Sequence, residues 1–118
     1  MTDCGGDPMR MEELTINHKD CATACATCML ACSYCLEKCI GMEAMERCAK
    51  LCRDCMLICA DCARLDAAGS ERAAAMCRAC AEACEACAEE CGKHDSDHCR
   101  QCARACRDCA EHCRKMAS

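Results

Sequence analysis

The chain has 118 residues, the length of one domain, but its composition is not that of an ordinary globular core. Hydrophobic residues make up 53% of the chain, yet 22 of them are Cys, and Phe and Trp are absent. Leu, Ile, Val and Phe together contribute nine residues, far below their usual share. A core of aliphatic or aromatic side chains is therefore excluded. The chain is either disordered or built around cysteine.

Charge and helix propensity argue against disorder. The 15 Lys and Arg nearly balance the 20 Asp and Glu, whereas disordered chains usually carry a high net charge. Ala, Glu, Arg, Lys and Met favour helix, and the only proline is Pro8. Because the chain has no basic cluster and no apolar run that could span a bilayer, we expect no nucleic acid and no membrane partner. The first residues carry no export signal, which predicts a cytoplasmic protein.

The cysteines after Cys4 fall into four groups, and within each group the steps alternate between three and four residues. This alternation gives the heptad spacing of a helix that packs against partners along one seam. The groups are Cys21, Cys25, Cys28, Cys32, Cys35 and Cys39; Cys48, Cys52, Cys55, Cys59 and Cys62; Cys77, Cys80, Cys84, Cys87 and Cys91; and Cys99, Cys102, Cys106, Cys109 and Cys113. The spacing predicts four helices whose seams are lined by thiols.

Turn-forming residues lie where the groups break, at Gly41, at Gly69-Ser70 and between Gly92 and Asp97. Gly92 suits a helix C-terminus, and Asp95 or Ser96 suits an N-cap. We predict helices over residues 17–42, 44–67, 71–92 and 96–116. Short connections favour antiparallel neighbours, so the predicted fold is all-α, an antiparallel up-down-up-down four-helix bundle with a Cys-lined core.

The N-terminal residues stand apart from the four groups. Residues 1–8 are expected to form a mobile lead, ahead of a single Cys-rich domain over residues 9–118. Met9 to Ile16 are predicted to form a short helical lead-in to the first helix. Cys4 matches no seam and is interpreted as an incidental thiol.

Packing or disulfide formation explains such a thiol-lined tube poorly. A single buried Cys is usually mere packing, but Leu or Ile at all the seam positions would bury more apolar area. Disulfide frameworks are rich in loops, and thiols three or four residues apart on one helix lie poorly for a disulfide torsion. Metal binding is therefore the favoured interpretation.

Thiolate is a soft ligand that selects Cu(I), Zn(II) or iron–sulfur clusters. A zinc ion bound by four thiolates is a dianion, and several such sites in a bundle core carry a large desolvation cost. Cu(I) bridged by shared thiolates reaches about one metal per sulfur and leaves the core near neutral. Iron–sulfur clusters use compact loop motifs, which this chain lacks. The sequence favours multiple Cu(I) ions per chain.

The four seams, the repeated Cys-x-x-x-Cys pairs and the connection from Cys91-Gly92-Lys93-His94 to His98-Cys99 resemble the bacterial copper storage proteins, in particular the cytosolic type. The resemblance covers roughly residues 10–116. It implies a homotetramer of four-helix bundles in which the seam cysteines, Cys21 through Cys113, hold many Cu(I) ions along each bundle axis. The function expected is cytosolic copper storage and sequestration.

Other function classes remain as alternatives. No Ser/His/Asp set, paired carboxylate or phosphate loop can be assembled, so no enzyme is expected. A zinc or mixed-metal thiolate buffer would bind about one ion per three or four cysteines. A thiol redox reservoir would need accessible thiols of low pKa.

The two ends of the predicted tube differ. One end gathers thioethers and imidazoles, which are weaker ligands suited to passing Cu(I) inward: Met42, Met45, His94 and His98. The alternative is that these Met residues only cap the core and both His lie in a polar loop. The opposite end resembles an apolar plug, with Leu14, His18, Leu65, Met76 and Met116. His18 keeps the seam register there, so this end stays open as an alternative entrance.

The first two helices also carry apolar residues where solvent is expected. Leu30 and Leu57 occupy the outermost positions, and the residues that flank them are Met29, Leu36, Leu51, Met56 and Ile58. A patch of this kind predicts self-association through helices one and two, with helices three and four facing water.

Overall fold

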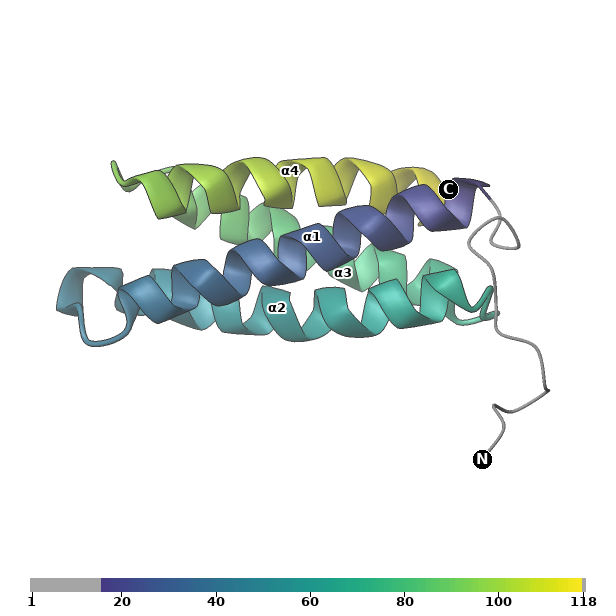
Figure 1. Cartoon of the computed structure of the whole chain (residues 1–118), viewed down its shortest axis with the longest axis horizontal. Coiled ribbons are helices and arrows are strands. Elements are labelled where there is room, and N and C mark those ends of the chain that lie inside the picture. Colours follow the sequence, from purple (N-terminus) through teal and green to yellow (C-terminus); the bar gives the residue numbers. More distant parts are fainter. Residues whose placement is uncertain (1–15, 118) are drawn as a thin grey trace, which may run out of the picture.

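The computed structural model describes residues 16–117. Its elements are α1 (Ile16–Cys39), the short 3-10 helix η2 (Glu43–Met45), α2 (Glu46–Ala67), α3 (Ala73–Cys91) and α4 (Asp97–Ala117) (Figure 1). The mobile lead expected over residues 1–8 and the helical lead-in before residue 16 lie outside the described residues.

The four long helices form a bundle in which consecutive helices run antiparallel (Figure 1). α1 packs against α2 and α4, and α3 packs against the same two helices. Short connections leave each helix no room to cross the bundle, so neighbours in sequence become neighbours in space. The predicted all-α four-helix bundle is confirmed. Within the described residues, no helix has the length and apolar character needed to cross a membrane.

The first helix ends three residues earlier than predicted, at Cys39 rather than at residue 42. Gly41 has a φ of +84°, a backbone conformation that glycine adopts without strain and that stops a helix. The Met42 N–H then donates to the Cys39 carbonyl at 3.1 Å, and Met42 itself is extended. The chain therefore turns at Gly41 and enters η2 directly.

The second helix ends at Ala67 as predicted, in a Schellman motif centred on Gly69. The Ser70 N–H donates to the Leu65 carbonyl and the Gly69 N–H to the Asp66 carbonyl, both at 3.0 Å. Gly69 has the positive φ, +67°, that this motif requires. Ser70 then accepts from the Arg72 N–H, which delays the start of α3 by two residues from the predicted residue 71.

The turn between α3 and α4 lies where the sequence predicts it, with different capping chemistry. Gly92 follows α3 with a helical φ of −66°, so its freedom from a side chain is not used for a left-handed turn. The Arg100 N–H donates to the Ser96 carbonyl at 3.0 Å, which puts Ser96 at the start of α4. The Ser96 hydroxyl is buried and finds no partner among the described residues.

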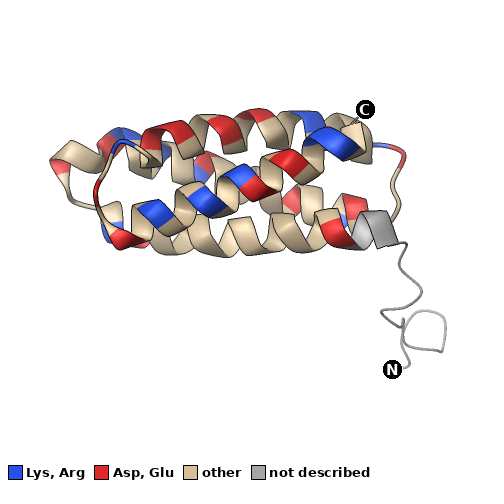
Figure 2. Ribbon diagram, turned by 90° about the horizontal axis from the view of Figure 1, so that it is seen from above, with Lys and Arg blue, Asp and Glu red and all other residues tan. Residues whose placement is uncertain are grey.

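Charged residues are spread unequally over the helices (Figure 2). α4 carries both basic and acidic residues along its length, whereas α1 has no charged residue between Cys21 and Leu36. On the outer side of α1 and α2, Leu30 is 64% exposed and Leu57 56% exposed. These two residues face outward as predicted, whereas the five predicted to flank them are partly buried and pack against the core: Met29, Leu36, Leu51, Met56 and Ile58.

Candidate metal centre

All 21 seam cysteines lie inside the bundle as free thiols, each at most 1% exposed. The 3.5-residue spacing places every seam on the inner face of its helix, and small alanines such as Ala81 and Ala103 fill the space between neighbouring helices. We call this column of 21 cysteines, from Cys21 to Cys113, the thiol ladder. It is the core of the protein.

The middle of the ladder shows how the four seams meet. Cys28, Cys55, Cys84 and Cys106 come from α1, α2, α3 and α4 respectively. The Sγ atoms of Cys28 and Cys106 are 3.6 Å apart, as are those of Cys55 and Cys84, and Cys28 lies 3.8 Å from Cys84. Four thiols from four helices thus converge on one point of the bundle axis. We call this layer the central rung.

Neighbouring layers share sulfur atoms rather than forming isolated sites. Cys106 belongs both to a four-thiol group with Cys28, Cys32 and Cys55 and to a second group with Cys32, Cys87 and Cys102. Along one helix, the Sγ atoms of Cys28 and Cys32 are 3.9 Å apart. The ladder is therefore a continuous array, in which an inner sulfur such as that of Cys28 has sulfur neighbours on its own helix and on other helices.

Sulfur spacing alone does not separate copper from zinc. A tetrahedral zinc site with Zn–S bonds of about 2.3 Å has edges of about 3.8 Å, which is also the spacing found here. Cys32 and Cys106 each belong to more than one group, so their thiolates can bridge two ions and lower the negative charge carried per metal. The array therefore suits monovalent ions bridged by thiolates.

We call the end of the bundle where α1 turns into α2 and α3 into α4 the mouth. Burial keeps the thiols near the mouth protonated. It raises the pKa of Cys39 to about 12 and also raises that of Cys48, because the thiolate would lose its hydration. Deeper in the ladder, a hydrogen bond from Cys113 lowers the pKa of Cys109 to about 6 and in return raises that of Cys113. Neighbouring thiols thus share protons, and loading with metal must displace them.

Two of the four predicted mouth residues reach the ladder. His98 Nδ1 lies 3.4 Å from Cys35 Sγ and 3.5 Å from Cys99 Sγ. Met45 is buried in the core cluster at the same end. His98 therefore contacts the ladder directly, and Met45 is buried at the same end.

The other two predicted mouth residues are not brought to a thiol by any described contact. Met42 is 51% exposed after the early end of α1. His94 Nε2 lies 3.1 Å from Glu90 Oε2, and the Glu90 carboxylate also pairs with Arg47 and Lys93. Although burial opposes ionisation of Glu90, the hydrogen bonds from His94 and Lys93 hold its pKa below the ordinary value. The sequence analysis did not predict the pairing of His94 with Glu90. The signal for it was their spacing, because residues four apart on a helix lie side by side.

The opposite end of the ladder is not closed by apolar side chains alone. Met76 and Met116 pack against the core there, as predicted for a plug. Asp66, which the sequence analysis did not single out, is fully buried one turn beyond Cys62, at a seam position of α2. Leu14 and the His18 side chain, predicted for the same end, lie outside what the structure describes.

A column of buried free thiols, with an imidazole and a thioether at one end, defines a thiolate-rich metal-binding bundle. The model of the copper storage protein family matches residues 14–118, so the chain belongs to that family. Its function is copper storage through the buried cysteines of a four-helix bundle, and it is a metal store rather than an enzyme.

Solved structures agree with this assignment. A Cu(I)-bound copper storage protein, BsCsp3, is 43% identical with a TM-score of 0.82, covering 86% of this chain and 99% of that one. The apo copper storage protein 3 of Bacillus subtilis is 46% identical with a TM-score of 0.79, covering 84% and 97%. A cytosolic copper storage protein from Streptomyces lividans, with five coppers, is 29% identical with a TM-score of 0.80, covering 86% and 92%. The comparison with curated proteins found no match.

Proposed function

We propose that this chain stores and sequesters many Cu(I) ions inside the bundle through bridging thiolates. The observation that carries the proposal is the sharing of sulfurs between neighbouring layers, as at Cys106. An apolar tube cannot hold a column of bare thiolates, because each buried charge loses its hydration. Monovalent ions in a ratio of about one per sulfur remove that charge as they bind.

The proposed ligands are the 21 cysteines of the thiol ladder, joined at the mouth by thioethers and imidazoles. The mouth residues we include are Met42, Met45, His94 and His98. Met45 and His98 lie against the ladder, and we assign them contact with the outermost ions. Met42 and His94 are assigned an earlier step, in which an incoming ion is bound before it reaches a thiol. Thioether and imidazole suit that step because they hold Cu(I) more weakly than thiolate does.

The metal stoichiometry tests the storage proposal. Anaerobic titration of the reduced protein with Cu(I), against a competing chromophoric chelator, is expected to saturate at about one ion per ladder thiol, or roughly 20 per chain. Zn(II) in the matched titration is expected to saturate at about five ions, because each takes four thiolates. Saturation by only about five Cu(I) ions would instead support a zinc or mixed-metal buffer. Rapid oxidation of the apo thiols by mild peroxide, together with little copper uptake, would support a redox reservoir.

We propose a cytoplasmic location. The support is the similarity over 86% of this chain to the cytosolic copper storage protein of Streptomyces lividans. A reducing cytosol would keep the ladder thiols free of disulfides and ready for metal.

We also propose that the chain self-associates through the outer face of α1 and α2, as the homotetramer that the family resemblance implies. Leu30 and Leu57 are more than half exposed there, and α1 carries no charge between Cys21 and Leu36. An exposed apolar area of this kind is usual for an interface and unusual for a free surface. The charged face of α4 would then meet solvent.

Placing charges on this apolar surface tests self-association. Leu30→Glu with Leu57→Glu is expected to convert the oligomer to monomers in sedimentation velocity, because two carboxylates would be buried without partners. Gln101→Glu on the exposed side of α4 adds a charge outside the proposed interface and is expected to leave the oligomer intact. Sedimentation of the unsubstituted chain as a monomer would refute the proposal.

A further inference from the structure

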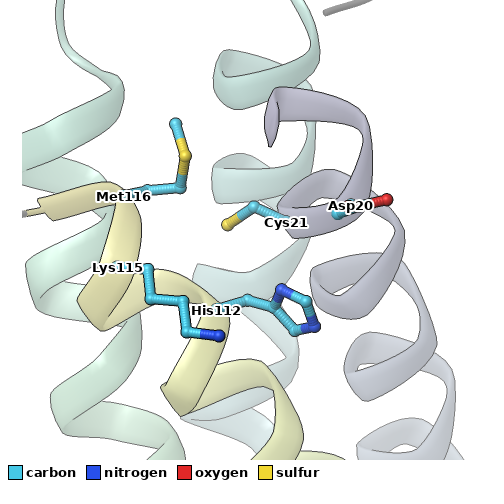
Figure 3. A pocket seen from close by; sticks show the side chains of 5 residues that line it. All are labelled: Asp20, Cys21, His112, Lys115 and Met116. Atoms are coloured by element: carbon cyan, nitrogen blue, oxygen red, sulfur yellow. The ribbon is translucent and has the colours of Figure 1, made fainter. Parts of the chain in front are cut away.

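The end of the thiol ladder farthest from the mouth opens into a hollow between α1 and α4. It has a volume of about 250 Å³, and the described residues that line it are Asp20, Cys21, His112, Lys115 and Met116. In Figure 3 the Cys21 sulfur points into this space and the His112 ring reaches from α4 toward α1, while the Asp20 side chain points away. A thiol, an imidazole and a thioether therefore border one opening.

The hollow is continuous with the ladder through Cys21. Cys21 Sγ lies 3.9 Å from both Cys77 Sγ and Cys113 Sγ, and Cys113 Sγ lies 3.7 Å from Cys25 Sγ. Cys21 itself is only 1% exposed, whereas the His112 side chain is 32% exposed and Met116 is half-buried. An ion bound at His112 and Met116 could pass to Cys21 by one exchange of ligands. A second exchange, from Cys21 to Cys113, would bring it into the interior of the ladder.

α4 presents a His-Cys pair at each of its ends, His98-Cys99 and His112-Cys113. The two histidines are separated by two heptads, so they occupy the same position relative to the seam. At the mouth this position brings His98 within 3.5 Å of Cys99 Sγ. Among the described residues, His112 pairs with Asp108 on the exposed surface at 3.9 Å, and so long an ion pair contributes little. Surface pairing with Asp108 therefore does not account for His112.

We propose that Cys21, His112 and Met116 form a second copper port, through which Cu(I) is exchanged between the ladder and a soluble carrier. The inference rests on the proposed storage of Cu(I). The exchange is a ligand substitution: the copper stays monovalent, and the Cys21 thiol releases its proton to solvent when its sulfur binds the ion. Imidazole and thioether hold the ion weakly enough to hand it on in either direction. We call these three residues the α1–α4 port.

The test compares rates of copper removal at the two ends of the ladder. Fully loaded protein is mixed anaerobically with excess bathocuproine disulfonate, and the appearance of its Cu(I) complex is followed. The port variant is His112→Ala with Met116→Leu, the matched mouth variant is His98→Ala, and a third protein combines all three substitutions. His112→Gln alone keeps a polar side chain at the port and guards against a folding defect of the double substitution.

The rates of copper removal through the mouth and through the port add. Removing one route therefore lowers the total rate only by the part that this route carried. We expect removal to slow about twofold in the port variant and about tenfold or more in the combined variant, because ligand loss at both ends leaves neither route intact. His112→Gln should change the rate in the same direction as the port variant. A combined variant no slower than His98→Ala would overturn the port. The capacity measured before each removal reports on storage separately, so a capacity of only a few ions would contradict the storage proposal and not the port.

Discussion

Loading with Cu(I) is expected to raise the midpoint of thermal unfolding by about 30 °C or more. The apo core consists of cysteine and alanine with one methionine, Met45. Cysteine and alanine side chains each bury little apolar area, so the metal-free bundle has little hydrophobic free energy to offset the conformational entropy of the chain. Each ion bound only by the folded chain adds about 2.7 kcal/mol when the free metal exceeds the dissociation constant a hundredfold. Many ions therefore contribute tens of kcal/mol to the free energy of unfolding. Copper binding to thiols of the unfolded chain reduces this contribution.

Circular dichroism melts of apo and loaded protein, under anaerobic conditions near pH 7, measure this effect. The choice of pH affects the apo midpoint, because the pKa of Cys39 is raised to about 12, above the ordinary thiol value of 9.0. The unfolded chain would release that proton near pH 9 and the folded chain only near pH 12, so the contribution of Cys39 to apo stability is complete below pH 9 and is lost as the pH rises toward 12. Removing copper with a chelator should return the loaded protein to the apo midpoint. Equal midpoints for the apo and loaded forms would contradict a core held together by metal.

The cysteine spacing was sufficient to predict the bundle and the ladder, for a geometric reason. A residue every 3.5 positions lies on one face of a helix, and four such faces joined by short turns have one common interior. Small side chains leave little choice of rotamer or helix separation, so the sulfur of a residue such as Cys28 or Cys84 can hardly point elsewhere. The Schellman end of α2 was equally accessible, because Gly69 stands where the seam pattern stops.

The ends of the ladder could not be predicted in the same way, because there side chains compete for partners. His94 has a carboxylate one helical turn away, and its ring pairs with Glu90 rather than with a thiol. Met42 lies on the far side of the left-handed Gly41, which takes it out of the helical register that placed it over the core. His112 sits one residue from the seam, and only the gap between α1 and α4 reveals that it borders Cys21. Heptad position decides what is buried, but local pairing and helix offsets decide what faces an opening.

Removing the central rung is expected to lower copper capacity by about four ions or more while the bundle remains folded. The substitutions are Cys28→Val and Cys84→Val on one diagonal, with Cys55→Ala and Cys106→Ala on the other. Two larger and two smaller side chains conserve the total volume, which cores tolerate at a cost of about 1.5 kcal/mol or less per site. Because these sulfurs also belong to neighbouring groups, their loss removes bridges as well as ligands.

The titration that measures capacity, repeated on this variant, also tests whether ions travel along the column. The central rung divides the ladder into two roughly equal parts, one ending at His98 and the other at Cys21. With the α1–α4 port intact, both parts of the ladder should fill rapidly. With His112→Ala and Met116→Leu added, the part that ends at Cys21 should fill about tenfold more slowly, because ions entering at the mouth must then cross the missing central rung. Cys4→Ser, outside the four seam groups, is the control and should leave capacity unchanged. Unchanged capacity after loss of the central rung would mean that these sulfurs are packing groups, and the continuous array would then not be the store.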